Sequence, residues 1–185
     1  MTKVRFVTVR DLYESFPTAV RDVGEDATDD PSVEFVRAMA QQSNYGAALS
    51  YCAYLLPRRE AVWWSIACVR QVDGLGASEK ACLDAAEVWV RNPDEAPRRR
   101  ALELGMAGNT KLPATWVALA AGWSGGSMAP SDAQRLPVAP QLTAQAVRVA
   151  LMAAAPRLAF KARDAAQQAW IDTGLRYAVA DAAIR

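Results

Sequence analysis

Residues 57–70 read Pro-Arg-Arg-Glu-Ala-Val-Trp-Trp-Ser-Ile-Ala-Cys-Val-Arg, a strong helix candidate between other alanine-rich helical segments. Consecutive helix residues point about 100° apart, so Trp63 and Trp64 cannot both lie at the centre of one narrow buried stripe. Trp64 is in step with the small residues Ala61, Ala67 and Cys68. This spacing predicts that Trp64 is buried and that Trp63 is the tryptophan available to a groove or a partner.

The segments on both sides of this stretch carry helix signals. Asp30-Pro31 combines a capping residue with a proline suited to a first helical turn, and Pro113 starts another helix in the same way. Thr8 followed by Asp11 resembles a capping box. Pro156 is expected to break a C-terminal helix, and Gly174 to end the next one, which leaves a last helix over 175–184.

No convincing pair of strands remains, so the sequence predicts an all-α protein, an irregular bundle of about eight to ten helices. Stacked helical hairpins are the alternative, because 57–74 and 113–126 share a proline start, a tryptophan and a glycine stop. A single domain over 1–185 is expected. It divides into short helices with an acidic loop (1–29), a central helical core (30–126), a proline-rich connector (127–142) and C-terminal helices (143–185).

Composition narrows the classes of function. The chain has 21 basic and 20 acidic residues, a net charge of +1, which argues against a nucleic-acid partner. The longest charge-free window, 112–131, is interrupted by glycines and prolines and is too short in its apolar part for a membrane span. The N-terminus lacks the pattern of a secretory signal. We therefore expect a cytoplasmic protein without a membrane span, whereas its oligomeric state is left open.

The chain contains no histidine and three cysteines. The missing histidine removes Ser-His-Asp and Cys-His mechanisms as well as histidine metal sites. The sequence from Gly122 to Gly126 matches G-x-S-x-G, but a nucleophile elbow needs a strand and a histidine base, so we interpret it as a helix end. No phosphate-binding glycine motif is present. We expect no enzyme, no catalytic residue, no cofactor and no metal.

The cysteines Cys52, Cys68 and Cys82 lie singly in helical segments. Buried reduced thiols are the expected state, with a disulfide or a redox role as the alternatives.

Arginine and tryptophan are the residue types most suggestive of binding. The clusters 58–59 and 98–100 are either solvated helix faces paired with nearby carboxylates, or docking sites for an acidic partner surface. Six tryptophans are many for this length, and tryptophan with arginine is a common combination at interface hot spots. The candidate partner-binding residues are Arg58, Arg59, Trp63, Arg98, Arg99, Trp123, Gly125 and Gly126.

Three runs carry a resemblance to a known family. They are 62–68 (Val-Trp-Trp-Ser-Ile-Ala-Cys), 85–90 (Ala-Ala-Glu-Val-Trp-Val) and 116–130, which begins Trp-Val-Ala-Leu-Ala-Ala-Gly-Trp-Ser-Gly-Gly. From about Ser43 to its end, the chain is similar to small all-helical bacterial proteins associated with type VI secretion gene clusters. The resemblance implies an accessory role that handles a secreted effector or a spike component, and it supplies no catalytic residues.

Two functions follow as hypotheses. The first is a non-enzymatic, chaperone-like adaptor that binds another protein. The second is a small-molecule-binding or regulatory helical domain, with a pocket enclosed by Trp64, Trp89 and Trp116. The exposure of each tryptophan distinguishes the two.

Overall fold

The computed structural model describes residues 4–128 and 136–179, and these parts of the chain form ten α-helices and no β-strand. The prediction of an all-α multi-helix bundle is confirmed. The helices are α1 (Val9–Ser15), α2 (Pro17–Val23), α3 (Ser32–Gln41), α4 (Tyr45–Leu55), α5 (Arg58–Val69), α6 (Ala77–Arg91), α7 (Glu95–Ala107), α8 (Pro113–Gly122), α9 (Leu142–Ala154) and α10 (Arg163–Val179), with 3₁₀ turns η1 (Ala155–Arg157) and η2 (Phe160–Ala162). Parts of the predicted connector (129–135) and of the last predicted helix (180–185) lie outside the described residues.

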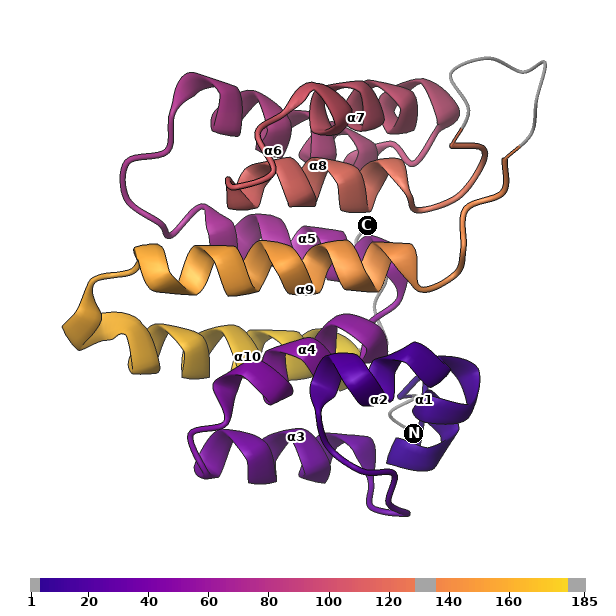
Figure 1. Ribbon diagram of the computed structural model, residues 1–185, viewed down its shortest axis with the longest axis vertical. Coiled ribbons are helices and arrows are strands. Elements are labelled where there is room, and N and C mark those ends of the chain that lie inside the picture. The colour runs from indigo at the N-terminus through magenta and orange to yellow at the C-terminus, as the bar shows by residue number, and fades with distance from the viewer. Residues whose placement is uncertain (1–3, 129–135, 180–185) are drawn as a thin grey trace.

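The helices are stacked roughly side by side (Figure 1). In the view of Figure 1, α6, α7 and α8 form the upper part, α5 and α9 the middle, and α4 and α10 the part below. The short helices α1, α2 and α3 lie at the lower end. None of the helices in the described ranges has the length and apolar character needed to cross a membrane.

Helix α9 joins the two halves of the bundle. It packs against α8 and α5 on one side and against α4 on another, and α10 returns to pack against α4, α5 and α3. In a solenoid each repeat contacts only its neighbours along the chain. Here, helices about ninety residues apart in sequence lie together, so the chain forms one irregular bundle and not a row of hairpins.

Helix α8 explains the long charge-free window of the sequence. Every residue of this helix is buried apart from Trp116, because α6, α7, α9 and α5 all pack against it. A helix that is covered on nearly all sides is apolar on all sides. The apolar part of the window, Pro113–Gly122, is therefore a buried core helix.

The two adjacent tryptophans of α5 differ as predicted. Trp64 is fully buried, and its Nε1 donates a hydrogen bond of 2.8 Å to the carbonyl oxygen of Trp170 in α10. Trp170 is buried as well, and its Nε1 donates to the side chain of Gln71 at 2.9 Å. Trp63 is only half-buried and packs against the edge of the core.

The expected helix end at Gly174 is wrong. Helix α10 runs through this residue from Arg163 to Val179. A Cβ at position 174 would lie 3.1 Å from the indole of Trp64, which is tighter than ordinary van der Waals contact. Glycine is present because the ring of Trp64 lies directly against the backbone of α10, and not because the helix ends.

Helices α1 and α2 are held to the bundle by polar contacts. Thr8 and Asp11 form the predicted capping box. The carboxylate of Asp22 accepts hydrogen bonds from the hydroxyl of Tyr54 in α4, at 2.5 Å, and from Gln145 in α9, at 3.1 Å. Arg148 of α9 donates to the carbonyl oxygen of Asp22. These contacts join the N-terminal helices to α4 and α9.

The three cysteines are free and buried. Burial raises the pKa of the Cys52 thiol to about 12, and it also raises the pKa values of Cys68 and Cys82. A thiol that stays protonated is a poor nucleophile and metal ligand. The prediction of buried reduced thiols is confirmed.

Candidate functional site

The sequence-predicted residues lie near one end of the upper half of the bundle. The start of α5 contacts the end of α6 through Arg59, and it reaches the segment between α8 and α9 through Arg58. The start of α7 contacts the end of α8 through Arg98. In Figure 1 this end is at the right, where the connector leaves α8 and enters α9.

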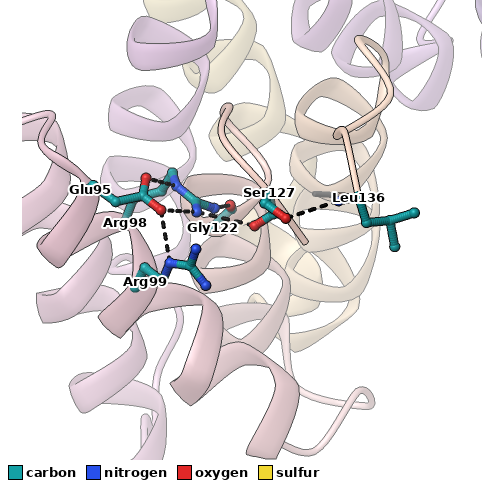
Figure 2. Close-up of polar contacts among 6 residues, drawn as sticks. All are labelled: Glu95, Arg98, Arg99, Gly122, Ser127 and Leu136. Atoms are coloured by element: carbon teal, nitrogen blue, oxygen red, sulfur yellow. Dashed lines mark hydrogen bonds and ion pairs between the residues drawn. The ribbon is translucent and has the colours of Figure 1, made fainter. Parts of the chain in front are cut away.

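Arg98 is the centre of this end, and it is buried. Its side chain is 4% exposed and forms two hydrogen bonds with the carboxylate of Glu95, at 2.6 and 2.7 Å. The same guanidinium donates to the carbonyl oxygens of Gly122, at 2.5 Å, and Ser127, at 3.1 Å (Figure 2). The expectation that Arg98 lies on a docking surface does not hold. Arg98 closes the last turn of α8 and fixes the start of the connector.

The connector is closed by a second set of contacts. The backbone N–H of Met128 donates to the carbonyl oxygen of Leu136, at 2.9 Å, and the N–H of Leu136 donates to the hydroxyl of Ser127, at 3.1 Å. Figure 2 shows Ser127 between Arg98 and Leu136. The segments before and after residues 129–135 therefore meet at Ser127. Because Arg98 binds the carbonyl oxygen of Ser127, it also holds this meeting point against the end of α8.

Two other arginines of the predicted set also bind helix ends. Arg58 donates to the carbonyl oxygen of Ser124, at 2.8 Å, and to that of Pro140, at 3.4 Å. Arg59 donates to the carbonyl oxygen of Val90 in the last turn of α6, at 2.6 Å. The last carbonyls of a helix lack partners within the helix and carry partial negative charge, so a cation is favourable there. These arginines connect neighbouring helices and are not solvated faces.

Glu95 is the carboxylate that the arginines of α7 share. It pairs with Arg98 and, through a 2.8 Å contact, with Arg99. Hydrogen bonds from Arg98, followed by those from Arg99, lower the pKa of Glu95 to about 2. The Arg99 side chain remains 23% exposed and lies on the outer side of the cluster. Of the two interpretations of the arginine run, pairing with nearby carboxylates is the one seen at Arg98 and Arg99, with Glu95 as the partner.

The exposed part of this end is aromatic. Trp116 of α8 and Trp123, the residue that caps the end of α8, lie two turns apart, and their rings meet edge to face at 6.5 Å between centroids. Both are half-buried. The Nε1 of Trp116 donates to the carbonyl oxygen of Thr110, whereas the Nε1 of Trp123 has no hydrogen-bond partner among the described residues. These indoles are the part of α8 and its C-terminal turn that reaches the surface.

The turn after Trp123 contains two glycines with different roles. Gly126 has φ +65°, and a Cβ there would lie 2.9 Å from the guanidinium of Arg98. A side chain at Gly126 would therefore be strained and would displace Arg98. Gly125 has a negative φ, and a Cβ there would meet nothing within 4 Å. We call Trp116, Trp123, Gly125 and Gly126 the tryptophan surface.

Trp63 lies in a different environment. The guanidinium of Arg91 at the end of α6 lies over its ring, 5.4 Å from the centroid. Arg91 also pairs with Glu87 at 2.6 Å, and Glu87 pairs with Arg70. The side chains of Trp63 and Arg59 thus contact α6, while Arg58 contacts the connector. The sequence grouped Trp63, Trp123 and Arg58-Arg59 with the glycine loop as candidates for one surface, but the structure separates Trp63 and Arg59 from Trp123.

Sequence reasoning missed Trp116 as a surface residue and Arg91 as the cover of Trp63. The seven-residue spacing of Trp116 and Trp123 was a usable signal, because residues two turns apart share a helix face. No local signal pairs Arg91 with Trp63, since their contact depends on how α5 and α6 cross.

Two cavities among the described residues have linings that contain no tryptophan. One is an open groove of about 470 Å³ between α3 and α10, lined by residues that include Val33, Arg37, Leu175 and Arg176. The other, of about 160 Å³, lies between α6, α7 and the start of α8. Trp64 and Trp89 are buried in helix packing. Within residues 4–128 and 136–179, no group of three side chains could hold a metal ion.

Comparison with known proteins gives a family without an assigned activity. Neither the curated proteins nor the solved structures contain a match to this chain. A family model matches residues 35–178, from α3 through nearly all of α10. The chain therefore belongs to the family of unknown function DUF6931.

Proposed function

We propose that this chain is a non-enzymatic adaptor that binds another protein through the tryptophan surface. The observation that carries the proposal is the edge-to-face pair of Trp116 and Trp123, half-exposed on a helix that is otherwise buried. Tryptophans that are rigidly held and partly exposed are the commonest anchors of protein interfaces. The Nε1 of Trp123 is buried and has no partner among the described residues, so the accessible part of this indole is its apolar ring.

The arginines support this surface from within. Arg58 and Arg98 bind the carbonyl oxygens of Gly122, Ser124 and Ser127, which directly flank Trp123 and the glycine turn. Thr143 of α9 donates to the carbonyl oxygen of Trp123, at 3.0 Å. A surface whose backbone is fixed before binding loses less conformational entropy when a partner docks. In this proposal the arginines position the surface, and the indoles contact the partner.

The resemblance to proteins of type VI secretion gene clusters supplies the class of partner. In the proposal, the adaptor acts in the cytoplasm and handles a secreted effector or a spike component in a chaperone-like manner. Such a role needs a stable recognition surface and no catalytic group.

The test is an affinity capture from the native host with three forms of the chain. Gly125→Lys places a long charged side chain beside Trp123 without a clash, since position 125 has open space and a negative φ. Ala38→Lys makes the same kind of change at an exposed position of α3. We expect one protein to be captured by the wild type and by Ala38→Lys but not by Gly125→Lys, with equal melting temperatures. Repeated absence of any captured protein, or capture unaffected by Gly125→Lys, would refute the proposal.

A further inference from the structure

The turn between α9 and α10 exposes an aromatic side chain. Phe160 of η2 is 84% exposed, the highest value among the large hydrophobic side chains of the described ranges. Its neighbours Ala159 and Ala162 are exposed as well. In Figure 1 this turn, residues 155–162, projects at the left edge of the molecule, at the opposite end of α9 from the connector. We call it the α9–α10 turn.

The α9–α10 turn is held firmly at its base. Arg157 forms an ion pair with the buried carboxylate of Glu79 at the start of α6. Leu158 packs against the core, and the N–H of Ala162 donates to the carbonyl oxygen of Ala159 at 2.9 Å. Arg163 closes the turn with a 3.0 Å hydrogen bond to the carbonyl oxygen of Pro156. Phe160 is therefore presented on a fixed scaffold and not on a loose loop.

Positive charge that is not neutralised surrounds Phe160. Arg157 is paired with Glu79, but neither Lys161 nor Arg163 forms an ion pair with any residue that the structure describes. The guanidinium of Arg163 lies 5.8 Å from the ring centroid of Phe160, which places its positive charge beside the exposed ring. Asp164, the nearest acidic residue in sequence, is exposed and stays outside ion-pair distance of both cations.

We infer that the α9–α10 turn is a second docking element, which inserts Phe160 into an apolar pocket of a partner protein with carboxylates on its rim. The rigid aromatic side chain supplies the anchor, and the unpaired cations Lys161 and Arg163 are complementary to an acidic rim. One aromatic residue with two cations is weak as a membrane anchor, since stable attachment to lipid needs a larger apolar surface or a second signal. The observations therefore favour a protein.

This inference does not rest on the tryptophan surface. The two elements lie at opposite ends of α9, whose thirteen residues span roughly 20 Å. A chain with both elements can contact two partners, or two parts of one partner, at the same time. A variant that disrupts one element leaves the other element intact. A negative result for the α9–α10 turn can therefore be distinguished from a negative result for the tryptophan surface.

Site-specific photo-crosslinking in the native host tests the inference. The full-length chain carries Phe160→p-benzoylphenylalanine, and the matched control carries Met106→p-benzoylphenylalanine on α7, where the side chain is 69% exposed. We expect a protein that crosslinks from position 160 and not from position 106, with the crosslinked peptide next to Asp or Glu residues. Failure to obtain a crosslink specific to position 160 would overturn the inference.

Binding measurements with the purified crosslinked protein complete the test. Phe160→Ala is expected to weaken its affinity by about thirtyfold and Lys161→Glu by about tenfold, while Met106→Ala has no effect. The melting temperature should stay constant, because Phe160 is exposed. An unchanged affinity in Phe160→Ala would contradict the inference. A vesicle flotation experiment gives a second contradicting outcome. If the wild type floats with vesicles that contain 30% phosphatidylserine and Phe160→Ala does not, the α9–α10 turn binds a membrane and not a protein.

Discussion

The molecule contains two pairs of tryptophans that differ in burial and in the hydrogen bonds of their indole N–H groups. Trp64 and Trp170 are fully buried; the Nε1 of Trp64 donates to α10, and that of Trp170 donates to Gln71 in the turn after α5. Trp116 and Trp123 are half-exposed, and the Nε1 of Trp123 has no partner among the described residues. The buried pair joins α5 to α10, whereas the half-exposed pair lies at the edge of the core, on α8 and its C-terminal turn.

This difference separates packing from recognition within one residue type. A buried indole stabilises the fold through its contact area and its hydrogen bond. An indole held half-exposed by a rigid backbone contributes less to stability and is available to a partner. The arginines divide in a similar way: Arg98 is buried and paired with Glu95, while Arg163 at the other end of α9 forms no ion pair with any residue that the structure describes.

The largest expected effect is on the buried pair. Trp64→Ala should lower the free energy of unfolding by about 3–5 kcal/mol, because it opens a cavity between α5 and α10 and leaves the carbonyl of Trp170 without its donor. Trp116→Ala should cost less than about 2 kcal/mol, since that ring is half-exposed. Urea unfolding followed by circular dichroism measures both. Equal losses in the two variants would contradict the division between core and surface.

Arg98 should come next in effect. Arg98→Met leaves the carbonyl oxygens of Gly122 and Ser127 without their donor and should lower the free energy of unfolding by about 2–4 kcal/mol. Arg100→Met is the matched control on the same helix, because Arg100 is exposed and pairs only with Glu103 among the described residues. Its effect should stay within about 0.5 kcal/mol. Equal stability of the two variants would contradict the claim that Arg98 stabilises the end of α8 by binding these carbonyl oxygens.

Gly174 offers a smaller and more specific test. Alanine usually favours a helix over glycine by about 1 kcal/mol. Gly174→Ala should nevertheless destabilise the protein by about 1–3 kcal/mol, because the new methyl group meets the ring of Trp64. Gly125→Ala, which has open space, should leave the melting temperature nearly unchanged. A stabilised Gly174→Ala variant would show that α10 does not lie as close to Trp64 as the structure indicates.

The smallest effect concerns pH. The pKa of Glu95 is lowered to about 2 in the folded protein, so Glu95 binds fewer protons when folded than when unfolded at mildly acid pH. Glu95 therefore adds to the free energy of unfolding at pH values above the pKa that it has in the unfolded chain. This added stability is lost as the pH falls from about 5 towards 2. The Glu95 side chain is 56% exposed, so solvent screening keeps this contribution small. The urea midpoint of the wild type should fall towards that of Glu95→Gln across this pH range. A difference between the two midpoints that stays constant with pH would contradict the lowered pKa of Glu95.

The sequence was informative wherever a local signal determines the structure. Proline and capping residues located the starts of several helices, and the phase of Trp64 with Ala61 and Cys68 identified the buried indole. Gly174 was misread, because glycine can either end a helix or admit a neighbouring ring, and only the position of Trp64 decides between the two. Local sequence signals do not predict the contacts between helices that are far apart in the chain.

The candidate site was less predictable for the same reason. The run from Arg98 to Arg100 does not reveal which arginine faces inward, since that depends on the rotation of α7 against α8. The cover of Trp63 by Arg91 depends on the crossing of α5 and α6. The exposure of Phe160 was also outside the reach of sequence patterns, which generally predict that phenylalanine is buried.

The most direct test of the central claim is hydroxyl-radical footprinting of the tryptophans, with and without the captured partner. In the free chain, Trp116 and Trp123 should be oxidised, and Trp64 and Trp170 should be protected. In the complex, we predict that oxidation of Trp116 and Trp123 falls severalfold while that of Trp63 is unchanged. Oxidation of Trp116 and Trp123 that is the same in the free chain and in the complex would contradict the claim that this pair forms the binding surface.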